Sequence, residues 1–288
     1  MKSMSKHQEL NSLELRNLTI RFSNSSPIIK GCNLKFSQGK TYLLTGTTAS
    51  GKSTLLRFIK GLIPLFYSAT IFGEILVNGK LLTLEEFWEY RNEIGYLFQD
   101  PPLQVIGSSV ERDLAFGLEN LAIPPLEMKT IIEKIAHRLN IELLLNRNPD
   151  ELSGGELALV ALASILVLQP KILLLDEFTA FLDNSSRTQV FKTLKEIQTP
   201  NQIIIIVTHY LKEVLPLVDE VIVLDKGQVL LQAPKAFFIT SHFSIIKEKL
   251  RIPELFHLGI NLCESKGIDP IFEDVEGLYE LIGRENYV

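Results

Sequence analysis

The sequence predicts an α/β fold with an inserted helical subdomain, and three observations lead to this prediction. Short apolar runs typical of buried strands alternate with stretches of helical period. One long stretch of helical period, residues 100–168, separates two groups of these runs. A glycine-rich loop, Gly46–Thr54, joins an apolar run to the start of a helix. We therefore expect a sheet that positions the loop, with the helical stretch inserted between its strands.

The predicted strands follow from apolar alternation, continuous apolar runs and turn residues. The pair Asn78-Gly79 indicates a tight hairpin after one of them. The expected strands are residues 13–22, 28–36, 41–45, 73–79, 93–99, 172–175, 203–207, 221–224 and 228–232.

The predicted helices carry apolar residues at intervals of three or four. In the inserted stretch these residues are Ile131, Ile132, Ile135, Leu139 and Leu143. Another amphipathic helix is expected over residues 185–197. The main domain is predicted to span residues 10–235, and residues 236–288 form a C-terminal extension without a motif that suggests chemistry.

Composition excludes several classes of protein. The 288 residues are 46% hydrophobic, which is ordinary for a folded soluble chain. A net charge of −5 without a basic cluster argues against nucleic acid as a partner. The polar N-terminus lacks a signal peptide's apolar core, and no segment reaches the roughly 18 apolar residues of a membrane span. Cys32 and Cys263 have no metal-ligand spacing, so a reducing cytosol is the expected setting.

The glycine-rich loop fits G-x-x-x-x-G-K-[ST], the pattern of a phosphate-binding P-loop. A strand that enters a helix through such a loop aims backbone N–H groups and the positive end of the helix dipole at an anion. Lys52 is expected to reach the β- and γ-phosphates, and the Ser53 hydroxyl to bind Mg²⁺. The candidate nucleotide-binding residues are Gly46, Thr47, Thr48, Ala49, Ser50, Gly51, Lys52, Ser53 and Thr54.

Two acidic residues, Asp176 and Glu177, follow the apolar run 172–175 in the Walker B arrangement. Ligands of open α/β sheets bind at the carboxyl ends of the strands. Asp176 is expected to hold Mg²⁺ through a water molecule, and Glu177 to polarise the attacking water. Alone, such a pair is more often solvated, but a P-loop upstream in the same sheet favours the catalytic interpretation.

The segment Leu152-Ser153-Gly154-Gly155-Glu156 directly precedes a long apolar helix. Its glycines open the helix N-terminus to an anion, while Ser153 and Glu156 also fit a capping box, and both interpretations are compatible. With the P-loop and the strand-end acids, this segment resembles the signature of ABC-type ATPases, a resemblance that extends from about Leu13 to Gln232. It implies a P-loop NTPase domain with an antiparallel β subdomain, ATP and Mg²⁺ as cofactors, and Ser153, Gly154 and Gly155 as contacts to the partner's nucleotide.

The resemblance also assigns single residues. Gln99 resembles the Q-loop glutamine that senses Mg²⁺ and the γ-phosphate, and His209 resembles the switch histidine. Phe22 resembles the aromatic that stacks on adenine, although a core position explains it nearly as well. Leu182-Asp183 resembles the D-loop. The implied catalytic residues are Glu177, His209, Lys52 and Gln99, and the implied metal-binding residues are Ser53, Gln99 and Asp176.

Within that family, residues 99–121, which contain Val110-Glu111-Arg112-Asp113-Leu114-Ala115-Phe116-Gly117, resemble the ATPases of energy-coupling-factor (cobalt/vitamin-type) importers. The resemblance implies a second ABC ATPase subunit, identical or different, and membrane scaffold and substrate-binding subunits. It places the chain peripherally at the cytoplasmic face of the cell membrane, with scaffold helices in a groove near the Q-loop. The implied function is ATP-driven uptake of a vitamin or metal ion.

Seven positions depart from the family pattern: Glu156 replaces a Gln, Phe178 a Pro, Phe181 a small residue and Ala49 a common Gly, and the usual basic residues after position 156 are replaced by Leu157, Ala158 and Leu159. The chain's own P-loop site retains its key residues and is expected to be competent. The added carboxylate at position 156 and the lost cations near a partner's triphosphate are expected to weaken that second site, which predicts an asymmetric pair. The alternatives are a catalytically weakened regulatory subunit and a non-transport ABC ATPase; no long heptad segment of the kind found in DNA-repair ATPases lies between Gln99 and Leu152.

Overall fold

The computed structural model describes residues 10–23 and 25–235, and their strands form two sheets. The six-stranded sheet has the order β10-β9-β3-β8-β7-β6, and only β10 runs antiparallel to its neighbour. Its strands are β3 (Thr41–Gly46), β6 (Ile94–Leu97), β7 (Ile172–Asp176), β8 (Ile203–Val207), β9 (Glu220–Asp225) and β10 (Gln228–Pro234). The predicted extension, residues 236–288, lies outside the described residues.

The second sheet is antiparallel, with the order β2-β1-β4-β5. Its strands are β1 (Ser12–Phe22), β2 (Ile29–Ser37), β4 (Ala69–Val77) and β5 (Lys80–Leu82). The predicted hairpin is confirmed, because Asn78 and Gly79 connect β4 to β5 with φ of 52° and 77°. Positive φ at both turn residues gives the twist that two-residue hairpins favour.

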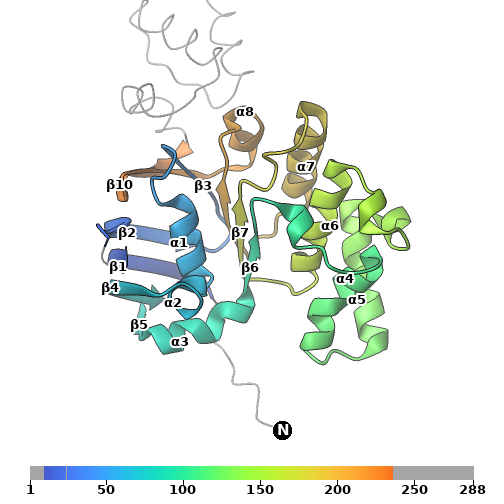
Figure 1. Ribbon diagram of the computed structural model, residues 1–288, viewed down its shortest axis with the longest axis horizontal. Helices are drawn as coiled ribbons and strands as arrows, with labels where there is room; N and C mark the ends of the chain where they lie inside the picture. The colour runs from blue at the N-terminus through green and yellow to red at the C-terminus, as the bar shows by residue number, and fades with distance from the viewer. Residues whose placement is uncertain (1–9, 24, 236–288) are drawn as a thin grey trace, which may run out of the picture.

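The helices lie on both sides of the six-stranded sheet (Figure 1). The group α4, α5 and α6 is on one side, and the four-stranded sheet with α1, α2 and α3 is on the other. The helices are α1 (Lys52–Ile59), α2 (Leu62–Leu65), α3 (Leu84–Glu89), α4 (Val110–Asn120), α5 (Pro125–Leu139), α6 (Gly154–Leu166), α7 (Asn184–Ile197) and α8 (Leu211–Val214). Short 3-10 helices cover Tyr90–Glu93, Pro101–Leu103, Glu142–Leu144, Pro149–Glu151 and Leu215–Leu217.

The central strands separate two hydrophobic cores. In β7, Leu173 and Leu175 face the core built with α4 to α7, whereas Ile172 and Leu174 face the core built with α1 and the four-stranded sheet. The apolar runs predicted as buried strands are therefore covered on both faces, as parallel strands require.

Of the apolar residues predicted to lie at helical spacing in the inserted stretch, the last, Leu143, does not lie on the helix. The helix α5 ends at Leu139, because the next residue, Asn140, has a left-handed φ of 55° that stops the helix. Leu143 follows in a 3-10 helix, and 92% of its surface is exposed. The other residues predicted at this spacing lie on α5, where Ile132, Ile135 and Leu139 are buried.

The strand predicted over residues 93–99 is shorter than expected. A side chain ends it, because Gln104 Oε1 accepts the Phe98 N–H at 2.6 Å and Gln104 Nε2 donates to the Tyr96 carbonyl at 3.1 Å. This amide takes the place of a neighbouring strand, and the chain turns away after Leu97.

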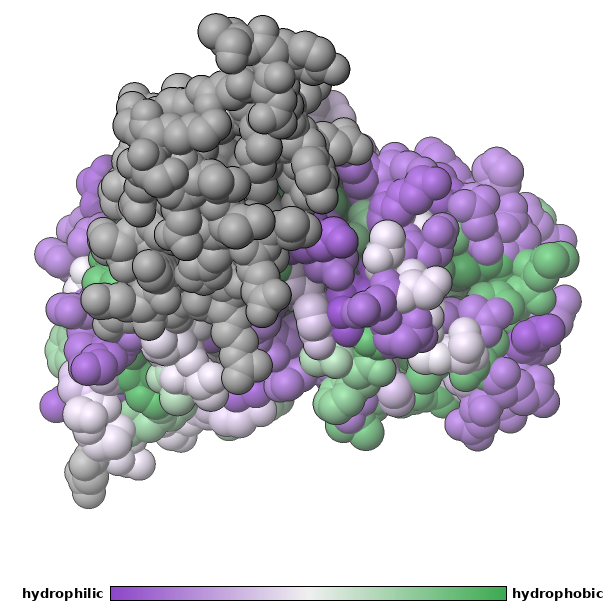
Figure 2. All heavy atoms as spheres, turned by 90° about the horizontal axis from the view of Figure 1, so that it is seen from above, coloured by the Kyte–Doolittle hydropathy of each residue, from purple (hydrophilic) through white to green (hydrophobic). Residues whose placement is uncertain are grey.

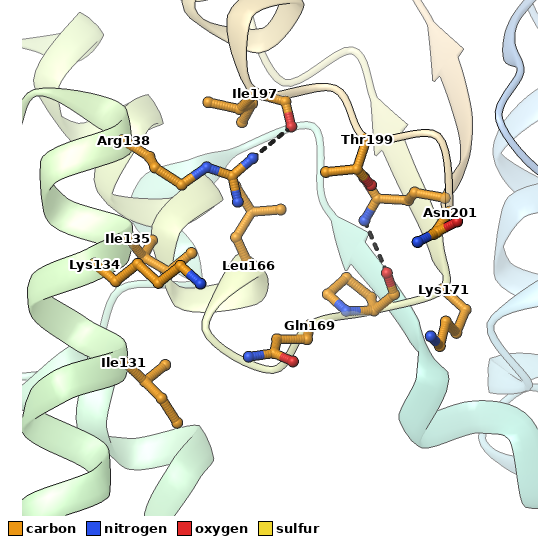
Figure 3. Close-up of a pocket in the computed structure, with 12 residues that line it drawn as sticks. Ile131, Lys134, Ile135, Arg138, Leu166, Gln169, Lys171, Ile197, Thr199 and Asn201 are labelled. Atoms are coloured by element: carbon orange, nitrogen blue, oxygen red, sulfur yellow. Dashed lines mark hydrogen bonds between the residues drawn. The ribbon is translucent and has the colours of Figure 1, made fainter.

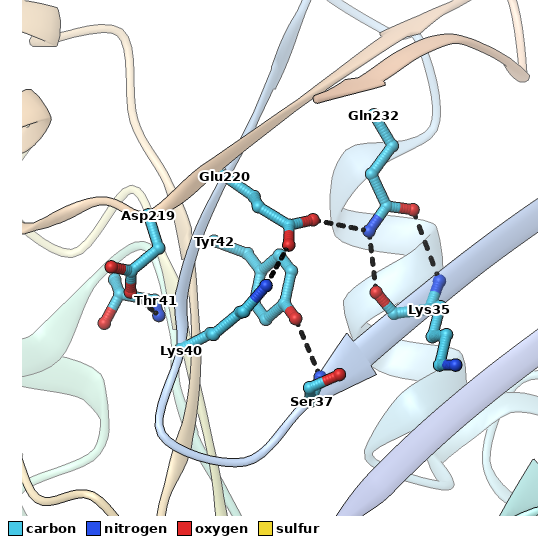
Figure 4. A network of polar contacts seen from close by, with 8 residues as sticks. All are labelled: Lys35, Ser37, Lys40, Thr41, Tyr42, Asp219, Glu220 and Gln232. Atoms are coloured by element: carbon cyan, nitrogen blue, oxygen red, sulfur yellow. Dashed lines mark hydrogen bonds and ion pairs between the residues drawn. The ribbon is translucent and has the colours of Figure 1, made fainter. Parts of the chain in front are cut away.

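A second amide joins the two sheets at the edge formed by β2 and β10 (Figure 4). Gln232 Nε2 donates to the Lys35 carbonyl at 2.6 Å, and Gln232 Oε1 accepts the Lys35 N–H at 3.3 Å. The same Nε2 also donates to Glu220, which forms an ion pair of 2.6 Å with Lys40. The Gln232 side chain thus pairs with β2 as a strand backbone would.

Gln232→Ala is expected to lower the free energy of unfolding by about 1–2 kcal/mol, because it removes a donor and an acceptor from the Lys35 backbone. Chemical denaturation of the full chain measures this loss. Gln228→Ala, at an exposed position of the same strand, is the control and is expected to change stability by less than about 0.5 kcal/mol. Equal losses in the two variants would contradict the proposed role of the amide.

No helix within residues 10–23 and 25–235 is long and apolar enough to cross a membrane. Hydrophilic side chains predominate on the described part of the face in Figure 2, and hydrophobic ones form smaller groups between them.

Candidate nucleotide-binding site

The predicted catalytic residues follow the carboxyl ends of neighbouring parallel strands. The P-loop follows β3, Asp176 ends β7, and Glu177 comes directly after it. His209 comes two residues after β8 ends. Since β3, β8 and β7 are adjacent and parallel, these residues meet at one edge of the sheet, where α/β proteins bind ligands.

The loop conformation requires glycine at two positions, Gly46 with φ of 145° and Gly51 with φ of 105°. A Cβ on Gly46 would lie 1.8 Å from a backbone oxygen of β9, and one on Gly51 would lie 2.7 Å from a side chain of β2. Thr47 Oγ1 also donates to Asp225 Oδ1 at 2.8 Å. The loop is therefore held closely against the sheet.

Lys52 lies buried inside this loop, and its Nζ donates to the carbonyls of Gly46 at 3.1 Å and Thr47 at 2.9 Å. Burial lowers the pKa of Lys52, and the nearby carboxylates of Glu177 and Asp176 oppose this effect. An ammonium group has three donors, so one remains for a ligand. The first N–H groups of α1 have no acceptor within the helix, and the loop therefore fits an anion.

Asp176 is held by hydrogen bonds to both of its carboxylate oxygens. Ser53 Oγ donates to Oδ1 at 3.1 Å, and the Tyr96 hydroxyl donates to Oδ2 at 2.8 Å. Burial raises the pKa of Asp176, and these two hydrogen bonds partly counteract it. A hydroxyl and a carboxylate are the hard oxygen ligands that Mg²⁺ prefers, so this pair fits the predicted metal.

Glu177 and His209 form a second pair, with 3.3 Å between Glu177 Oε1 and His209 Nε2. The hydrogen bond with His209 lowers the pKa of Glu177, burial opposes this, and the charge of Lys52 adds to the lowering. Glu177 has a left-handed φ of 48°, and its N–H donates to the Val207 carbonyl at 2.9 Å. Uncommon backbone conformations of this kind are frequent at functional sites.

Two other predicted residues are not joined to these pairs by any described contact. Gln99 is exposed and lies beyond the end of β6. Phe22 ends β1, pairs with Ala69 and packs partly buried against the core under the four-stranded sheet. The structure therefore supports the interpretation of Phe22 as a core residue, and its contact with adenine remains a prediction.

The signature segment forms the predicted capping box at the start of α6. Ser153 Oγ accepts the Glu156 N–H, and Glu156 Oε2 accepts the Ser153 N–H at 2.9 Å and its hydroxyl at 2.8 Å. These hydrogen bonds lower the pKa of Glu156, so its side chain is ionised. A hollow of about 680 Å³ lies between this segment and the start of α7, lined by Ser153, Gly155, Glu156 and residues 184–186 among others.

Arg187, which no sequence motif indicates, connects the segment after Glu177 with the segment after His209. It is buried on α7 and donates to the carbonyl of Leu182. Its guanidinium lies 3.3 Å from the centre of the Tyr210 ring, and the Tyr210 hydroxyl donates to the Ala180 carbonyl at 3.3 Å. Hydrogen bonds and ring packing therefore connect the residues around the predicted D-loop to Tyr210, which follows the predicted switch histidine.

Two of the unusual residues have different environments. Phe178 is buried, and its ring lies 6.0 Å from that of Phe191 in an edge-to-face arrangement. Phe181 is 75% exposed. The first therefore packs in the core under α7, while the second is free to contact another molecule.

A separate hollow of about 440 Å³ lies at the opposite end of the strands, between α5 and the turns before β7 and β8 (Figure 3). Arg138 donates across it to the Ile197 carbonyl at 2.8 Å, and Gln202 donates to the Pro170 carbonyl at 2.8 Å. Lys134 and Lys171 also line it. Because it lies at the amino ends of β7 and β8, it is distinct from the predicted nucleotide site.

Ala49, in place of the common glycine, has a left-handed φ of 60°. Ala49→Gly is expected to raise the free energy of unfolding by about 0.5–1 kcal/mol, because glycine adopts this conformation without the Cβ penalty. Thermal or chemical unfolding measures the gain. Ala122→Gly is the matched control, since Ala122 has φ of 55° in an exposed turn and is expected to show a similar gain. A loss of stability in Ala49→Gly alone would contradict this explanation.

Comparison with known proteins identifies the family. A family model described as ABC transporter matches residues 29–180. The energy-coupling factor transporter ATP-binding protein EcfA1 of Mycoplasma mobile is 35% identical, over 91% of this chain and 93% of its own length. The corresponding EcfA protein of Pediococcus pentosaceus is 38% identical, over 79% of this chain and 81% of its own. The chain belongs to this family of ATP-binding proteins.

The solved structures agree with this assignment. The structure of cbiO1 from Clostridium perfringens, described as part of the ABC transporter complex cbiONQ, has a TM-score of 0.72 and 32% identity, and the match covers 85% of this chain and 97% of that one. The predicted ABC-type fold is confirmed, and the chain is an ATPase of the transporter type. A non-transport ABC ATPase is not favoured.

Proposed function

We propose that this chain binds ATP with Mg²⁺ on its own P-loop and hydrolyses it in a pair with a second ABC ATPase subunit. The cycle drives uptake of a small nutrient, a vitamin or a metal ion, through membrane scaffold and substrate-binding subunits. One observation carries the proposal. Two side-chain pairs, Ser53–Asp176 and Glu177–His209, lie at the carboxyl ends of adjacent parallel strands. At the same edge of the sheet, β3 leads into the loop that contains the buried Lys52.

In this site Lys52 and the N–H groups at the start of α1 bind the β- and γ-phosphates. Ser53 and Asp176 would hold Mg²⁺, with Gln99 as a further ligand. When bound there, the ion would supply positive charge to balance that of the transferred phosphoryl group. Glu177 orients the water and accepts its proton, and its lowered pKa keeps it ionised for that task. His209 fixes the Glu177 carboxylate and contacts the γ-phosphate.

The signature of this chain serves the nucleotide of the second subunit. Ser153, Gly154 and Gly155 lie at the open start of α6, beside a hollow that a second molecule can enter. The ionised Glu156 carboxylate lies within hydrogen-bond distance of the Ser153 hydroxyl, and its negative charge repels a triphosphate. We propose an asymmetric pair in which the second site is weaker; two equally fast sites in a purified homodimer would exclude it.

The membrane scaffold is proposed to dock beside β6 and α4, and the chain to work peripherally at the cytoplasmic face of the membrane. A hollow of about 350 Å³ lies there, with Tyr96, Phe98, Gln104 and Leu121 in its lining. Phe98 and Leu121 are 38% and 50% exposed, so an apolar helix face can cover them. This position is next to the predicted Q-loop.

Affinity purification of the tagged full chain from its own membranes tests the proposal. We expect integral membrane proteins and a second ATPase subunit to co-purify, and the complex to hydrolyse ATP with Mg²⁺. A complex that binds ATP but does not hydrolyse it would favour the regulatory alternative. Recovery of the chain without any membrane protein would contradict the transport function.

A further inference from the structure

We infer that Tyr96 is a positioning residue for Asp176. Its hydroxyl holds the carboxylate in the orientation that binds Mg²⁺, and its backbone links that carboxylate to the hollow beside β6. The inference rests on the proposed Mg²⁺–ATP site.

The first step is the fixed orientation of the carboxylate. Tyr96 and Asp176 are 4% and 3% exposed, so water does not supply hydrogen bonds to the Asp176 side chain from bulk solvent. The Tyr96 hydroxyl donates to Asp176 Oδ2 at 2.8 Å, and the hydroxyl of Ser53, at the start of α1, donates to Asp176 Oδ1 at 3.1 Å. Two donors from different elements prevent rotation of the carboxylate and keep Oδ1 directed to the P-loop helix.

The second step is the support of Tyr96 itself. In the parallel pair β6–β7, Tyr96 lies opposite Leu174, two residues before Asp176. Its ring lies 4.6 Å from the Phe98 ring, and its carbonyl accepts from Gln104 Nε2. The tyrosine is therefore held by pairing, by ring packing and by a side-chain amide.

The residues that hold Tyr96 in place also line a surface hollow. Tyr96, Phe98 and Gln104 all line the hollow of about 350 Å³ beside β6. A segment bound there contacts the residues that hold the hydrogen-bond donor of Asp176.

Tyr96→Phe tests the hydroxyl, because it removes one oxygen and retains the ring. Tyr42→Phe is the matched control. Tyr42 is also a buried strand tyrosine, 1% exposed, and its hydroxyl accepts the Ser37 N–H at 2.7 Å. It has no described contact with Asp176, so the control reports the general cost of removing a buried tyrosine hydroxyl.

The measurement is the affinity of the full chain for the non-hydrolysable analogue AMP-PNP, by calorimetry, in excess Mg²⁺ and in excess EDTA. We expect Tyr96→Phe to weaken binding about threefold to thirtyfold in Mg²⁺ and by less than about twofold in EDTA. We also expect a higher half-saturating Mg²⁺ concentration in ATPase assays. Tyr42→Phe is expected to change neither affinity.

Three results would overturn the inference. Tyr96→Phe could bind as Tyr42→Phe does in both conditions, which would leave no role for the hydroxyl at Asp176. It could lose affinity equally in Mg²⁺ and in EDTA, which would show a general effect on the site. A wild-type chain that binds AMP-PNP equally with and without Mg²⁺ would instead refute the proposed metal site, and the inference with it.

Discussion

Glu177→Gln is expected to reduce ATP turnover about a thousandfold while ATP binding is retained. The amide has nearly the same shape as the carboxylate but cannot accept a proton from water, and general bases contribute roughly 10²–10⁴-fold to such rates. The residues that bind the phosphates, including Lys52, are untouched. Phosphate release measures turnover, and size-exclusion chromatography with light scattering measures the ATP-bound pair that we expect to accumulate.

The matched control for this variant is Glu196→Gln, an exposed position on α7. It removes the same charge from the surface and is expected to leave turnover within about twofold of the wild type. Unchanged turnover in Glu177→Gln would remove this residue from its proposed role. Loss of ATP binding together with turnover would show instead that Glu177 supports the binding site.

Lys52→Met is expected to weaken ATP binding at least about a hundredfold. The variant keeps the length of the apolar stem but loses the charge, and charge-assisted hydrogen bonds to phosphate are about twice as strong as neutral ones. It also leaves the Gly46 and Thr47 carbonyls without their donor, which is expected to cost about 1–3 kcal/mol of stability. Calorimetry and chemical denaturation measure the two effects separately.

Lys60→Met separates nucleotide binding from the loss of a partly buried lysine that donates to backbone carbonyls. Lys60 lies just after α1, donates to the carbonyls of Arg91 and Ile94, and has its pKa lowered by burial to about 8. This variant is expected to lose comparable stability and to bind ATP normally. Equal ATP affinity in the two variants would contradict the assignment of Lys52.

The site residues that local sequence patterns predict are those whose chemistry depends on near neighbours. The P-loop requires left-handed or crowded glycines at set positions, and Gly46 and Gly51 provide them. The capping box of Ser153 and Glu156 lies within four residues. The apolar run of β7 places Asp176 at its end because a strand buried on both faces has no polar position before it.

The residues that the patterns did not reveal act through contacts between distant parts of the chain. Tyr96 in β6 reads as an ordinary core residue, and only its pairing with β7 shows that the hydroxyl reaches Asp176. Arg187 reads as one residue of an amphipathic helix, yet it is buried against the Tyr210 ring. Gln232 and Lys35 are joined across 197 positions. None of these contacts corresponds to a motif or a regular spacing of residues in the sequence.

The sequence by itself determined the family, the α/β fold, the phosphate-binding loop and the acids at the strand end, because these depend on hydrophobic period, glycine geometry and short motifs. Only the tertiary structure decided which hydrogen bonds hold those acids, where β6 ends and which surfaces surround the site. Such contacts depend on strand order and on packing between segments far apart in the chain. The residues next to a position in the sequence do not indicate which residues contact it in the folded protein.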